Sequence, residues 1–298
     1  MNLPIIAEKR RLFKKRLGQP GIVIAPGCYD AFSAKIADHI GFEVLYMTGA
    51  GVSATLAGAP DVGLLTMTEM VEQARRITDV VALPLIADAD TGYGGTMNVI
   101  RTVRQFERAG VCAIHIEDQQ IPKKCGHLEG KRVVSTANMI DRLKAAVDAR
   151  TDPNFLIIAR TDARAVLGMS EALDRARRYA DAGADILFVE APEGLAEVQR
   201  VGEELTGLRP LLLNRGGADK TPPLSAAEAE HIGFKIIIFP GDAQKAAGQA
   251  MMGIYQGMKK SGNTRDLAVP MMSFHDRNEI LGMAEVRRLE ARFSTDQG

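Results

Sequence analysis

The feature that most constrains the fold is a series of eight short apolar runs that recur along nearly the whole chain. Each run has three to five residues, many of them β-branched, without alternation between apolar and polar residues. Runs of this kind are typical of strands in a parallel sheet that is buried on both faces. In order, they are Ile22–Ala25, Val44–Met47, Leu83–Ala87, Ala113–Ile116, Phe155–Ala159, Ile186–Val189, Leu211–Leu213 and Lys235–Phe239.

Segments with helical signals separate these runs. Thr66 and Glu69 are spaced as in a capping box, where each side chain satisfies a backbone N–H at the start of a helix. Gly110, Gly183 and Gly233 follow candidate helices, at positions where a left-handed residue commonly ends a helix. Alternation of strands and helices predicts a parallel α/β fold, and eight such units predict closure into a (β/α)8 TIM barrel.

The length of 298 residues fits one barrel with additions, since such barrels run to about 250 residues or more. We therefore expect one domain over residues 1–298. A basic helix over Glu8–Leu17 precedes the first run, and a long helix over Ala243–Lys260 follows the last one. A further helical segment over His275–Phe293 has no strand to cover, so we expect it to pack on another subunit or to cap one end.

Composition excludes several classes of protein. Lys plus Arg and Asp plus Glu each number 37, so the net charge is zero and the basic excess of a nucleic-acid-binding protein is missing. We expect no membrane span, because no apolar run reaches the ~20 residues needed, and the start of the chain is unlike a signal peptide. Three cysteines are too few for a disulfide framework and suit a reducing compartment. We expect a cytoplasmic protein that acts on a small molecule.

Charged or amide residues follow six consecutive strands. Because the chemistry of such barrels lies at the carboxyl ends of the strands, we expect these side chains to converge in one mouth. A purely structural barrel has little reason to gather them there, since buried unpaired charge is costly. In chain order they include Thr48, Asp88, Asp90, Glu117, Arg160, Asp162, Glu190 and Asn214.

Asp88, Asp90 and Glu117 form a candidate metal site. Asp88 and Asp90 are two residues apart, so on a continuous strand they point to the same face. Carboxylate oxygens suit Mg²⁺, with Mn²⁺ as the alternative metal. The competing interpretation is that these aspartates cap turns or pair with Arg160. His115 is near in sequence, but without a second histidine at ligand spacing it is a weak indication of zinc.

Arg160 is a planar bidentate donor that suits a substrate carboxylate. Its alternative role is a structural ion pair with Glu117 or Glu190. The glycine-rich turn that begins at Thr48 and Gly49 can present backbone N–H groups to the same anion. Tight backbone geometry explains the glycines of this turn equally well.

The segment from Gln119 to Lys131 is long, polar and punctuated by glycine, as are the lids of many barrel enzymes. Cys125 lies within it, next to Lys123, Lys124 and His127. Cations near a thiol favour the thiolate, so Cys125 is a candidate acid or base. Cys28 and Cys112 lack such neighbours, and we interpret them as packing residues.

The run Lys123-Lys124-Cys125-Gly126-His127, together with Asp88-Ala-Asp90-Thr-Gly92 and Ala159-Arg160-Thr-Asp162, resembles the isocitrate lyase/phosphoenolpyruvate mutase superfamily. The resemblance spans roughly residues 20–293. Its cysteine motif is specific for the lyase and hydrolase branch, since the mutase and phosphonopyruvate hydrolase branches lack it. The resemblance implies a barrel whose eighth helix is swapped between two subunits, in a dimer of dimers.

The resemblance also implies roles for the site residues. Asp90 would bind Mg²⁺ directly, with Asp88 and Glu117 acting largely through water. Cys125 would be the acid that protonates the enolate carbon after cleavage, on a gating loop that closes over the substrate. The residues expected to act in catalysis with Cys125 are Lys123, His127, Glu117 and Arg160. The residues implied to contact the substrate or its carboxylates are Tyr29, Thr48, Gly49, Ala50, Asp90, Lys124, Gly126, His127, Arg160, Glu190 and Asn214.

The implied activity is that of a carbon–carbon lyase. It would cleave a 2-hydroxydicarboxylate or tricarboxylate by a retro-aldol step, giving a 2-keto acid such as pyruvate and a second carboxylate. The segment Leu128–Lys131 is more similar to the dimethylmalate lyase group than to the methylisocitrate lyases. The alternatives are an oxaloacetate acetylhydrolase and a non-catalytic carboxylate-binding barrel.

Arg215 departs from the family pattern. The loop after Asn214 is short, and Arg215 stands where the hydrolase group has an apolar residue and a glutamate. We expect this extra cation either to bind a second carboxylate or to pair with Glu190.

Overall fold

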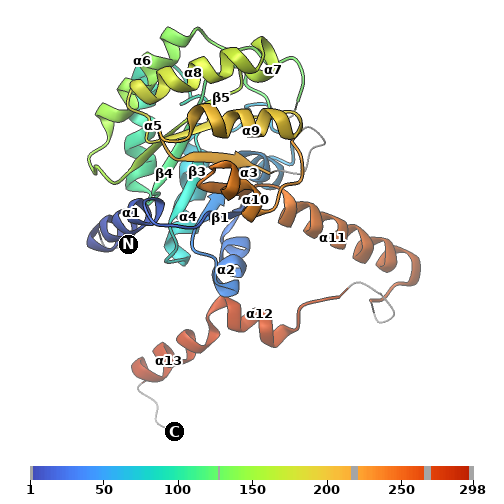
Figure 1. Cartoon of the computed structure of the whole chain (residues 1–298). Helices are drawn as coiled ribbons and strands as arrows, with labels where there is room; N and C mark the ends of the chain where they lie inside the picture. The colour runs from blue at the N-terminus through green and yellow to red at the C-terminus, as the bar shows by residue number, and fades with distance from the viewer. Residues whose placement is uncertain (1–2, 127, 216–220, 265–269, 295–298) are drawn as a thin grey trace.

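The computed structural model describes residues 3–126, 128–215, 221–264 and 270–294. Eight parallel strands close into a barrel in which each strand pairs with its neighbours in chain order, and β8 returns to β1 (Figure 1). The predicted (β/α)8 fold is therefore confirmed. The strands are β1 (Val23–Cys28), β2 (Leu45–Met47), β3 (Leu85–Asp88), β4 (Ala113–Glu117), β5 (Leu156–Thr161), β6 (Ile186–Val189), β7 (Leu211–Asn214) and β8 (Ile236–Phe239).

Most strands are apolar runs because both of their faces are buried, whereas Ile24 on β1 is 39% exposed. On β8, Ile236 and Ile238 belong to the cluster inside the barrel, whereas Ile237 belongs to the cluster between the strands and the surrounding helices. Successive side chains of a strand point to opposite faces, so one apolar run fills both layers.

Helices cover the outside of the barrel, and several begin as the sequence predicts. At the start of α4, Thr66 and Glu69 form the capping box, and Gly233 ends α10 in the left-handed conformation. The helices that follow the first seven strands are α2 (Ala31–Ile40), α3 (Gly49–Leu56), α4 (Met67–Val80), α5 (Thr96–Arg108), α6 (Thr136–Ala149), α7 (Arg164–Leu167), α8 (Met169–Asp181), α9 (Gly194–Leu205) and α10 (Ala226–Ile232).

Helix α1 (Leu3–Leu17) lies at the amino-terminal end of the strands and begins earlier than the predicted Glu8. Its Phe13 is 1% exposed and joins the cluster inside the barrel. Arg10 is buried beside it and donates a hydrogen bond of 2.8 Å to the carbonyl of Val111. The helix therefore closes the barrel end opposite to the predicted site.

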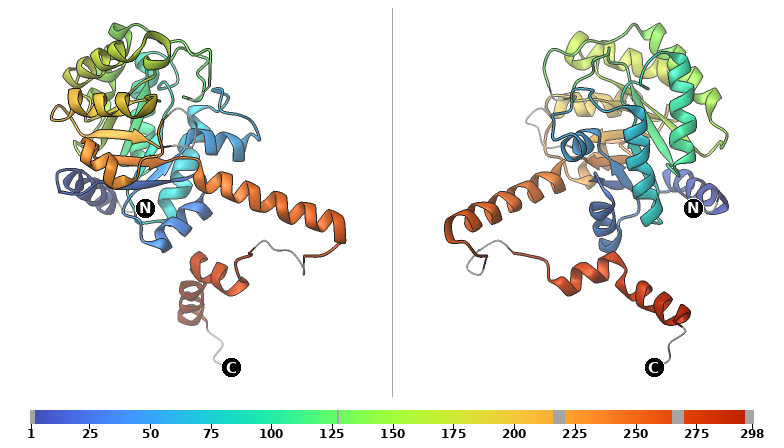
Figure 2. Two further views of the ribbon diagram at one scale, coloured as in Figure 1. Left: turned by 45° about the vertical axis from the view of Figure 1, so that its right-hand side comes forward. Right: turned by 180° about the vertical axis from the view of Figure 1, so that it is seen from behind.

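Three helices follow β8: α11 (Asp242–Ser261) extends away from the barrel, α12 (Phe274–Leu281) returns to contact α2, and α13 (Met283–Phe293) follows it (Figures 1 and 2). Gly282, with φ of 88°, separates α12 from α13, so the predicted segment 275–293 is two helices. The described part of α11 contains no buried residue, and its Met251, Met252 and Tyr255 are exposed. No helix in the described ranges is both long and apolar enough to span a membrane.

Candidate active site

The carboxyl ends of the strands surround a cavity of about 180 Å³. Its lining brings together residues from β2, β3, β5, β6 and β7 with the loop that carries Cys125. Predicted site residues in this lining are Thr48, Ala50, Asp88, Cys125, Gly126, Arg160, Glu190 and Asn214. Parallel strands that end at one edge of a barrel account for this convergence of residues far apart in the chain.

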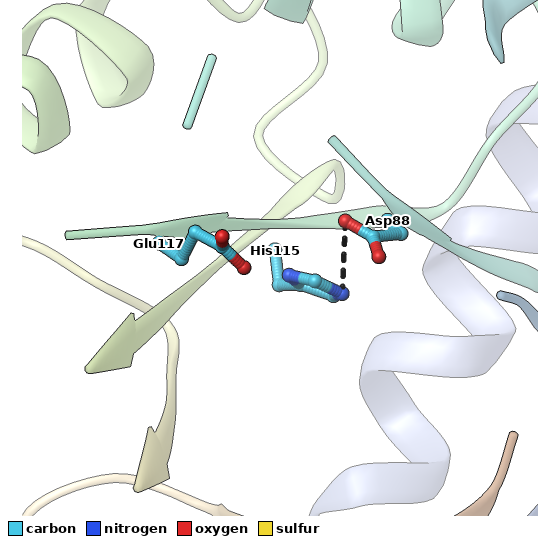
Figure 3. Close-up of side chains that lie close together, drawn as sticks. All are labelled: Asp88, His115 and Glu117. Atoms are coloured by element: carbon cyan, nitrogen blue, oxygen red, sulfur yellow. Dashed lines mark ion pairs between the residues drawn. The ribbon is translucent and has the colours of Figure 1, made fainter. Parts of the chain in front are cut away.

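Asp88, His115 and Glu117 lie together at the carboxyl ends of β3 and β4, with one ligand atom of each within 4.8 Å of the others (Figure 3). The three side chains are buried, and His115 Nε2 lies 3.5 Å from Asp88 Oδ1. Asp88 and His115 are directly paired across β3 and β4, and Glu117 follows His115 on the same face. This spacing was visible in the sequence and could have added His115 to the predicted cluster.

Asp90 is placed differently from its prediction. Strand β3 ends at Asp88, and Asp90 has a φ of 49°, so the expectation that both aspartates share one strand face was wrong. The Asp90 backbone N–H donates to Asp88 Oδ1 over 2.9 Å, which supports this left-handed turn. The Asp90 side chain forms an ion pair with Lys123, with Oδ1 and Nζ 2.5 Å apart.

Nearby cations do not fully compensate the burial of the carboxyl groups in this region. Burial raises the pKa of Glu117 well above its usual value and that of Asp90 to about 7, although cations lie nearby. Burial acts in the same direction on Asp88, but His115, Lys123 and Arg160 outweigh it and lower its pKa to about 2. Among the described residues, Glu117 Oε1 and His115 Nδ1 have no hydrogen-bond partner although they are buried. A divalent cation that prefers oxygen ligands fits this donor set.

Tyr46 and His115 form a pair that the sequence did not indicate. The Tyr46 hydroxyl lies 2.8 Å from His115 Nε2, and the two rings stack with centroids 5.8 Å apart. Burial lowers the pKa of His115 to about 4, so this imidazole is neutral at neutral pH. Among the residues the structure describes, Tyr46 lines the cavity and Tyr29, the predicted substrate tyrosine, does not.

The turn after β2 lies against the carboxylate cluster. Thr48 is the N-cap of α3, and its hydroxyl accepts a hydrogen bond from the backbone N–H of Gly51. A Cβ atom at Gly49 would lie 2.4 Å from Asp88 Oδ2, so only glycine fits this close approach. The glycine-rich composition of the turn thus has a packing reason within the site itself.

Arg160 is held by carboxylates of this chain. Its Nε and Nη2 donate to the two oxygens of Asp162 over 2.9 and 3.2 Å, and Nε lies 3.3 Å from Glu117 Oε2. Glu190 Oε1 is 3.9 Å from Nη2. The predicted alternative, an ion pair with Glu117 or Glu190, is therefore present. Arg160 also lines the cavity, so its guanidinium is oriented by these contacts and available at the cavity wall.

Glu190 and Asn214 meet on the far wall of the cavity. The Asn214 amide donates to both carboxylate oxygens of Glu190 over 3.3 Å. Both residues are buried; Asn214 is the last residue of β7, and Glu190 directly follows β6.

The loop between Asp118 and Ser135 brings Cys125 to the cavity. Its two ends are joined by a bridge between Gln119 and Val133, and the Cys125 N–H donates to the Asp61 carbonyl over 3.0 Å. Lys123 is buried and also pairs with Asp61 over 2.6 Å, whereas Lys124 is partly exposed and donates to the Glu129 carbonyl. The predicted site residue His127 lies outside the described residues.

Arg215 does not reach Glu190 among the described contacts. Its Nη1 lies 3.6 Å from Asp242 Oδ1, and its guanidinium stacks over the Phe239 ring. The cation that extends from α11 to the cavity lining is Lys245. Sequence reasoning missed Lys245, because nothing in the α11 sequence shows which of its residues faces the barrel mouth.

An eight-stranded parallel barrel, with buried carboxylates, an arginine and a thiol-bearing loop at one mouth, is the architecture of a (β/α)8-barrel enzyme. Residues 13–259 match the sequence profile of a family described as phosphoenolpyruvate phosphomutase. The chain belongs to the phosphoenolpyruvate mutase/isocitrate lyase superfamily.

Individual relatives point to one branch of this superfamily. The chain is 44% identical to a 2,3-dimethylmalate lyase of Eubacterium barkeri, over 95% of this chain and 97% of that protein. A crystal structure of a 2,3-dimethylmalate lyase matches with a TM-score of 0.90 and 40% identity, covering 95% of each chain. The chain is also 41% identical to a 2-methylisocitrate lyase of Aeropyrum pernix, over 96% of this chain and 90% of that protein.

A solved oxaloacetate acetylhydrolase, bound to 3,3-difluorooxalacetate, has a TM-score of 0.92 to this chain. The two chains are 33% identical, and the match covers 98% of this chain and 99% of the hydrolase chain. The similarity in fold therefore extends beyond the lyases. The sequence identity is higher to the lyases than to this hydrolase.

Proposed function

We propose that this protein is a Mg²⁺-dependent carbon–carbon lyase. Its substrate is a 2-hydroxydicarboxylate or tricarboxylate of the 2,3-dimethylmalate or 2-methylisocitrate type, which it cleaves to a 2-keto acid and a second carboxylate. The observation that carries the proposal is the position of Cys125 on the wall of a cavity that Arg160, Glu190 and Asp88 also line. The 44% identity to a 2,3-dimethylmalate lyase supports the same activity.

Asp88 and Glu117, with Asp90 and His115 beside them, would hold the cation. Mg²⁺ is the preferred metal and Mn²⁺ the alternative, because the carboxylate donors suit hard ions. When bound, the ion supplies a Lewis acid that stabilises negative charge on a substrate oxygen. The orphaned Glu117 Oε1 is the protein atom that most directly supports this role.

Side chains and backbone groups of the protein bind the substrate and transfer the protons. Arg160 and the N–H groups of the turn at Thr48, Gly49 and Ala50 bind the carboxylate next to the keto carbon. A base takes the proton of the 2-hydroxyl group, the carbon–carbon bond breaks, and its electron pair moves onto the carbon beside the second carboxylate. The Cys125 thiol then gives its proton to that carbon. Closure of the loop over the cavity excludes water from the carbanion.

Other groups would set the fit of the second carboxylate. Glu190, Asn214 and Gly126 line the cavity. Lys123, Lys124 and His127 belong to the same stretch of sequence as Cys125. The described cavity lining contains Tyr46 and Lys245 rather than Tyr29 and Arg215, so the first two are the residues proposed for substrate contact.

We further propose that residues 1–298 form one barrel domain that assembles into a cytoplasmic homotetramer. The exposed Met251, Met252 and Tyr255 on a helix that extends from the barrel support contact with a second subunit. Exchange of this helix between subunits would cover these apolar side chains.

A substrate screen tests the proposed activity. Release of 2-keto acid is measured with Mg²⁺ for 2,3-dimethylmalate, 2-methylisocitrate, citramalate, malate and isocitrate, with oxaloacetate as the hydrolase substrate. We expect cleavage of 2,3-dimethylmalate or 2-methylisocitrate that EDTA abolishes. Oxalate and acetate from oxaloacetate as the main products would favour the hydrolase, whose fold similarity is high. Binding without turnover of any compound would contradict both.

A further inference from the structure

Lys131 is a buried lysine at the end of the Cys125 loop. Its side chain is 3% exposed, an uncommon environment for an ammonium group. Its Nζ donates a hydrogen bond to the carbonyl oxygen of Gly126 and lies 3.1 Å from Asp162 Oδ1. Burying an ammonium group costs free energy unless its partners compensate the charge. The Gly126 carbonyl and the Asp162 carboxylate provide this compensation.

Asp162 connects Lys131 with Arg160. Its side chain is fully buried, and its two oxygens accept hydrogen bonds from Nε and Nη2 of Arg160. The Asp162 N–H is fixed in turn by Asp118 Oδ1 over 2.9 Å. One rigid carboxylate is therefore shared between the arginine of the cavity wall and the lysine of the loop.

Gly126, whose carbonyl accepts the hydrogen bond from Lys131, has very little positional freedom. A Cβ atom at Gly126 would lie 2.1 Å from Glu190 Oε1 and 2.6 Å from Arg160 Nη2. The Gly126 backbone thus packs directly against two side chains of the cavity wall. Cys125 precedes it, so the position of the Gly126 carbonyl also sets where the thiol lies.

Backbone contacts fix the base of the loop and one point near its tip. Gln119 pairs with Val133, and Gln120 donates to the Arg132 carbonyl over 2.8 Å. Near the tip, the Cys125 N–H donates to the Asp61 carbonyl over 3.0 Å, and the Gln119 side-chain amide bonds to the Lys124 backbone. Lys131 adds the side-chain contact that reaches the Gly126 carbonyl, next to the thiol.

We propose that Lys131 is a positioning residue that fixes the Cys125 loop in contact with the cavity, through the same Asp162 carboxylate that orients Arg160. This inference rests on the proposed function for its kinetic consequence, but not for its structural one. Loss of the lysine would free the loop tip and lower kcat, because the thiol would reach the reacting carbon less often. The KM would change less, since Lys131 does not line the described cavity.

Hydrogen exchange measured by mass spectrometry tests this role without any substrate. We expect amides of residues 121–130 to exchange at least about 10-fold faster in Lys131→Met than in wild type, because an ionic hydrogen-bonded contact to the loop is lost. Peptides from β4 and β5 should keep their protection. Lys131→Arg, which retains the charge and donors, should recover most of the loop protection, and kcat should follow the same order.

Lys9→Met is the matched control. Lys9 is also buried, and its Nζ donates to the Val81 carbonyl over 3.3 Å at the opposite end of the barrel. This variant should leave exchange of the loop at the wild-type rate. Lys131→Gln, which keeps an N–H donor but no charge, replaces Lys131→Met in the comparison if that variant is insoluble.

Wild-type exchange of the loop in a folded Lys131→Met or Lys131→Gln protein would overturn the proposal. So would an equal increase in Lys9→Met, because the effect would then be a general loss of stability. If wild type releases no 2-keto acid from any substrate, the proposed function fails, and the exchange comparison still decides the role of Lys131.

Discussion

The ammonium of Lys123 lies 2.5 Å from Oδ1 of Asp90, and both side chains are buried. This contact joins the cysteine loop to the strand end from which a metal ligand was predicted. Asp61 pairs with the same ammonium over 2.6 Å, so one cation compensates two carboxylates. Burial opposes a charged Lys123, but Asp90, Asp88 and Glu117 outweigh it and raise its pKa well above the usual value.

Replacing Lys123 by methionine should therefore destabilise the protein strongly. Removal of one partner from a buried ion pair leaves an uncompensated charge, at a cost of about 3 kcal/mol or more. Unfolding by urea at neutral pH measures this loss. Lys124→Met is the neighbouring control and should change the stability by less than about 0.5 kcal/mol, since Lys124 is partly exposed. Equal effects of the two substitutions would show that the Lys123 contacts contribute nothing specific.

Metal binding should depend on Glu117 more than on Asp90. Glu117 belongs to the cluster with Asp88 and His115, whereas Asp90 lies outside this cluster with its Oδ1 2.5 Å from the Lys123 ammonium. Loss of a ligand or of its immediate support typically weakens metal binding by about 10- to 100-fold. Titration of the EDTA-treated protein with Mn²⁺, followed by electron paramagnetic resonance, should show the larger loss in Glu117→Gln and the smaller in Asp90→Asn. The reverse order would assign the ion to the Asp90 side of the site.

Gly126→Ala should abolish most activity without unfolding the barrel. The added Cβ would lie 2.1 Å from Glu190 Oε1, so the loop would have to withdraw from the cavity. We expect kcat/KM to fall at least about 100-fold, as when a reacting group is displaced by roughly 1 Å. Gly95→Ala is the control, because a Cβ at Gly95 meets nothing within 4 Å and its activity should stay within about twofold of wild type. Normal turnover by Gly126→Ala would mean that this loop position is not needed for catalysis.

The imidazole of His115 should remain neutral in mildly acidic solution. Burial lowers its pKa to about 4, against about 6.5 for an unperturbed histidine. Between these values the unfolded chain binds more protons, so this group's contribution to stability is present above pH 6.5 and is lost as the pH falls toward 4. Nitrogen-15 NMR of the metal-free protein should show no titration of His115 between pH 8 and 5.5. A midpoint near 6.5 would place this ring in contact with solvent.

The fold could be predicted because local and global signals agree. Each apolar run supplies both faces of one strand, as Ile236, Ile237 and Ile238 do on β8, so strand positions were evident without any knowledge of pairing. The Thr66–Glu69 capping box involves a spacing of three residues, which can be recognised in the sequence. The division of the C-terminal segment at Gly282 could be missed, because a glycine is tolerated inside many helices.

The site was predictable as a set of strand ends, but not as a set of contacts. Asp90 leaves the strand and turns toward Lys123 through a left-handed backbone, which alternation along a strand cannot reveal. The Tyr46–His115 pair depends on the register between β2, β3 and β4, and the reach of Lys131 to Asp162 depends on the path of a long loop. Such contacts are fixed by tertiary structure rather than by sequence spacing.

The most direct test of the central claim is product analysis with wild type and Cys125→Ser, using whichever of 2,3-dimethylmalate and 2-methylisocitrate is cleaved. In D2O with Mg²⁺, wild type should release a 2-keto acid and a carboxylate in equal amounts. The carboxylate should carry one deuterium on the carbon that lost the bond, because the exchanged Cys125 thiol delivers it. Cys125→Ser should keep its metal affinity and lose turnover by at least about 100-fold. Wild-type rates in Cys125→Ser, or no 2-keto acid from either compound with wild type, would contradict the account.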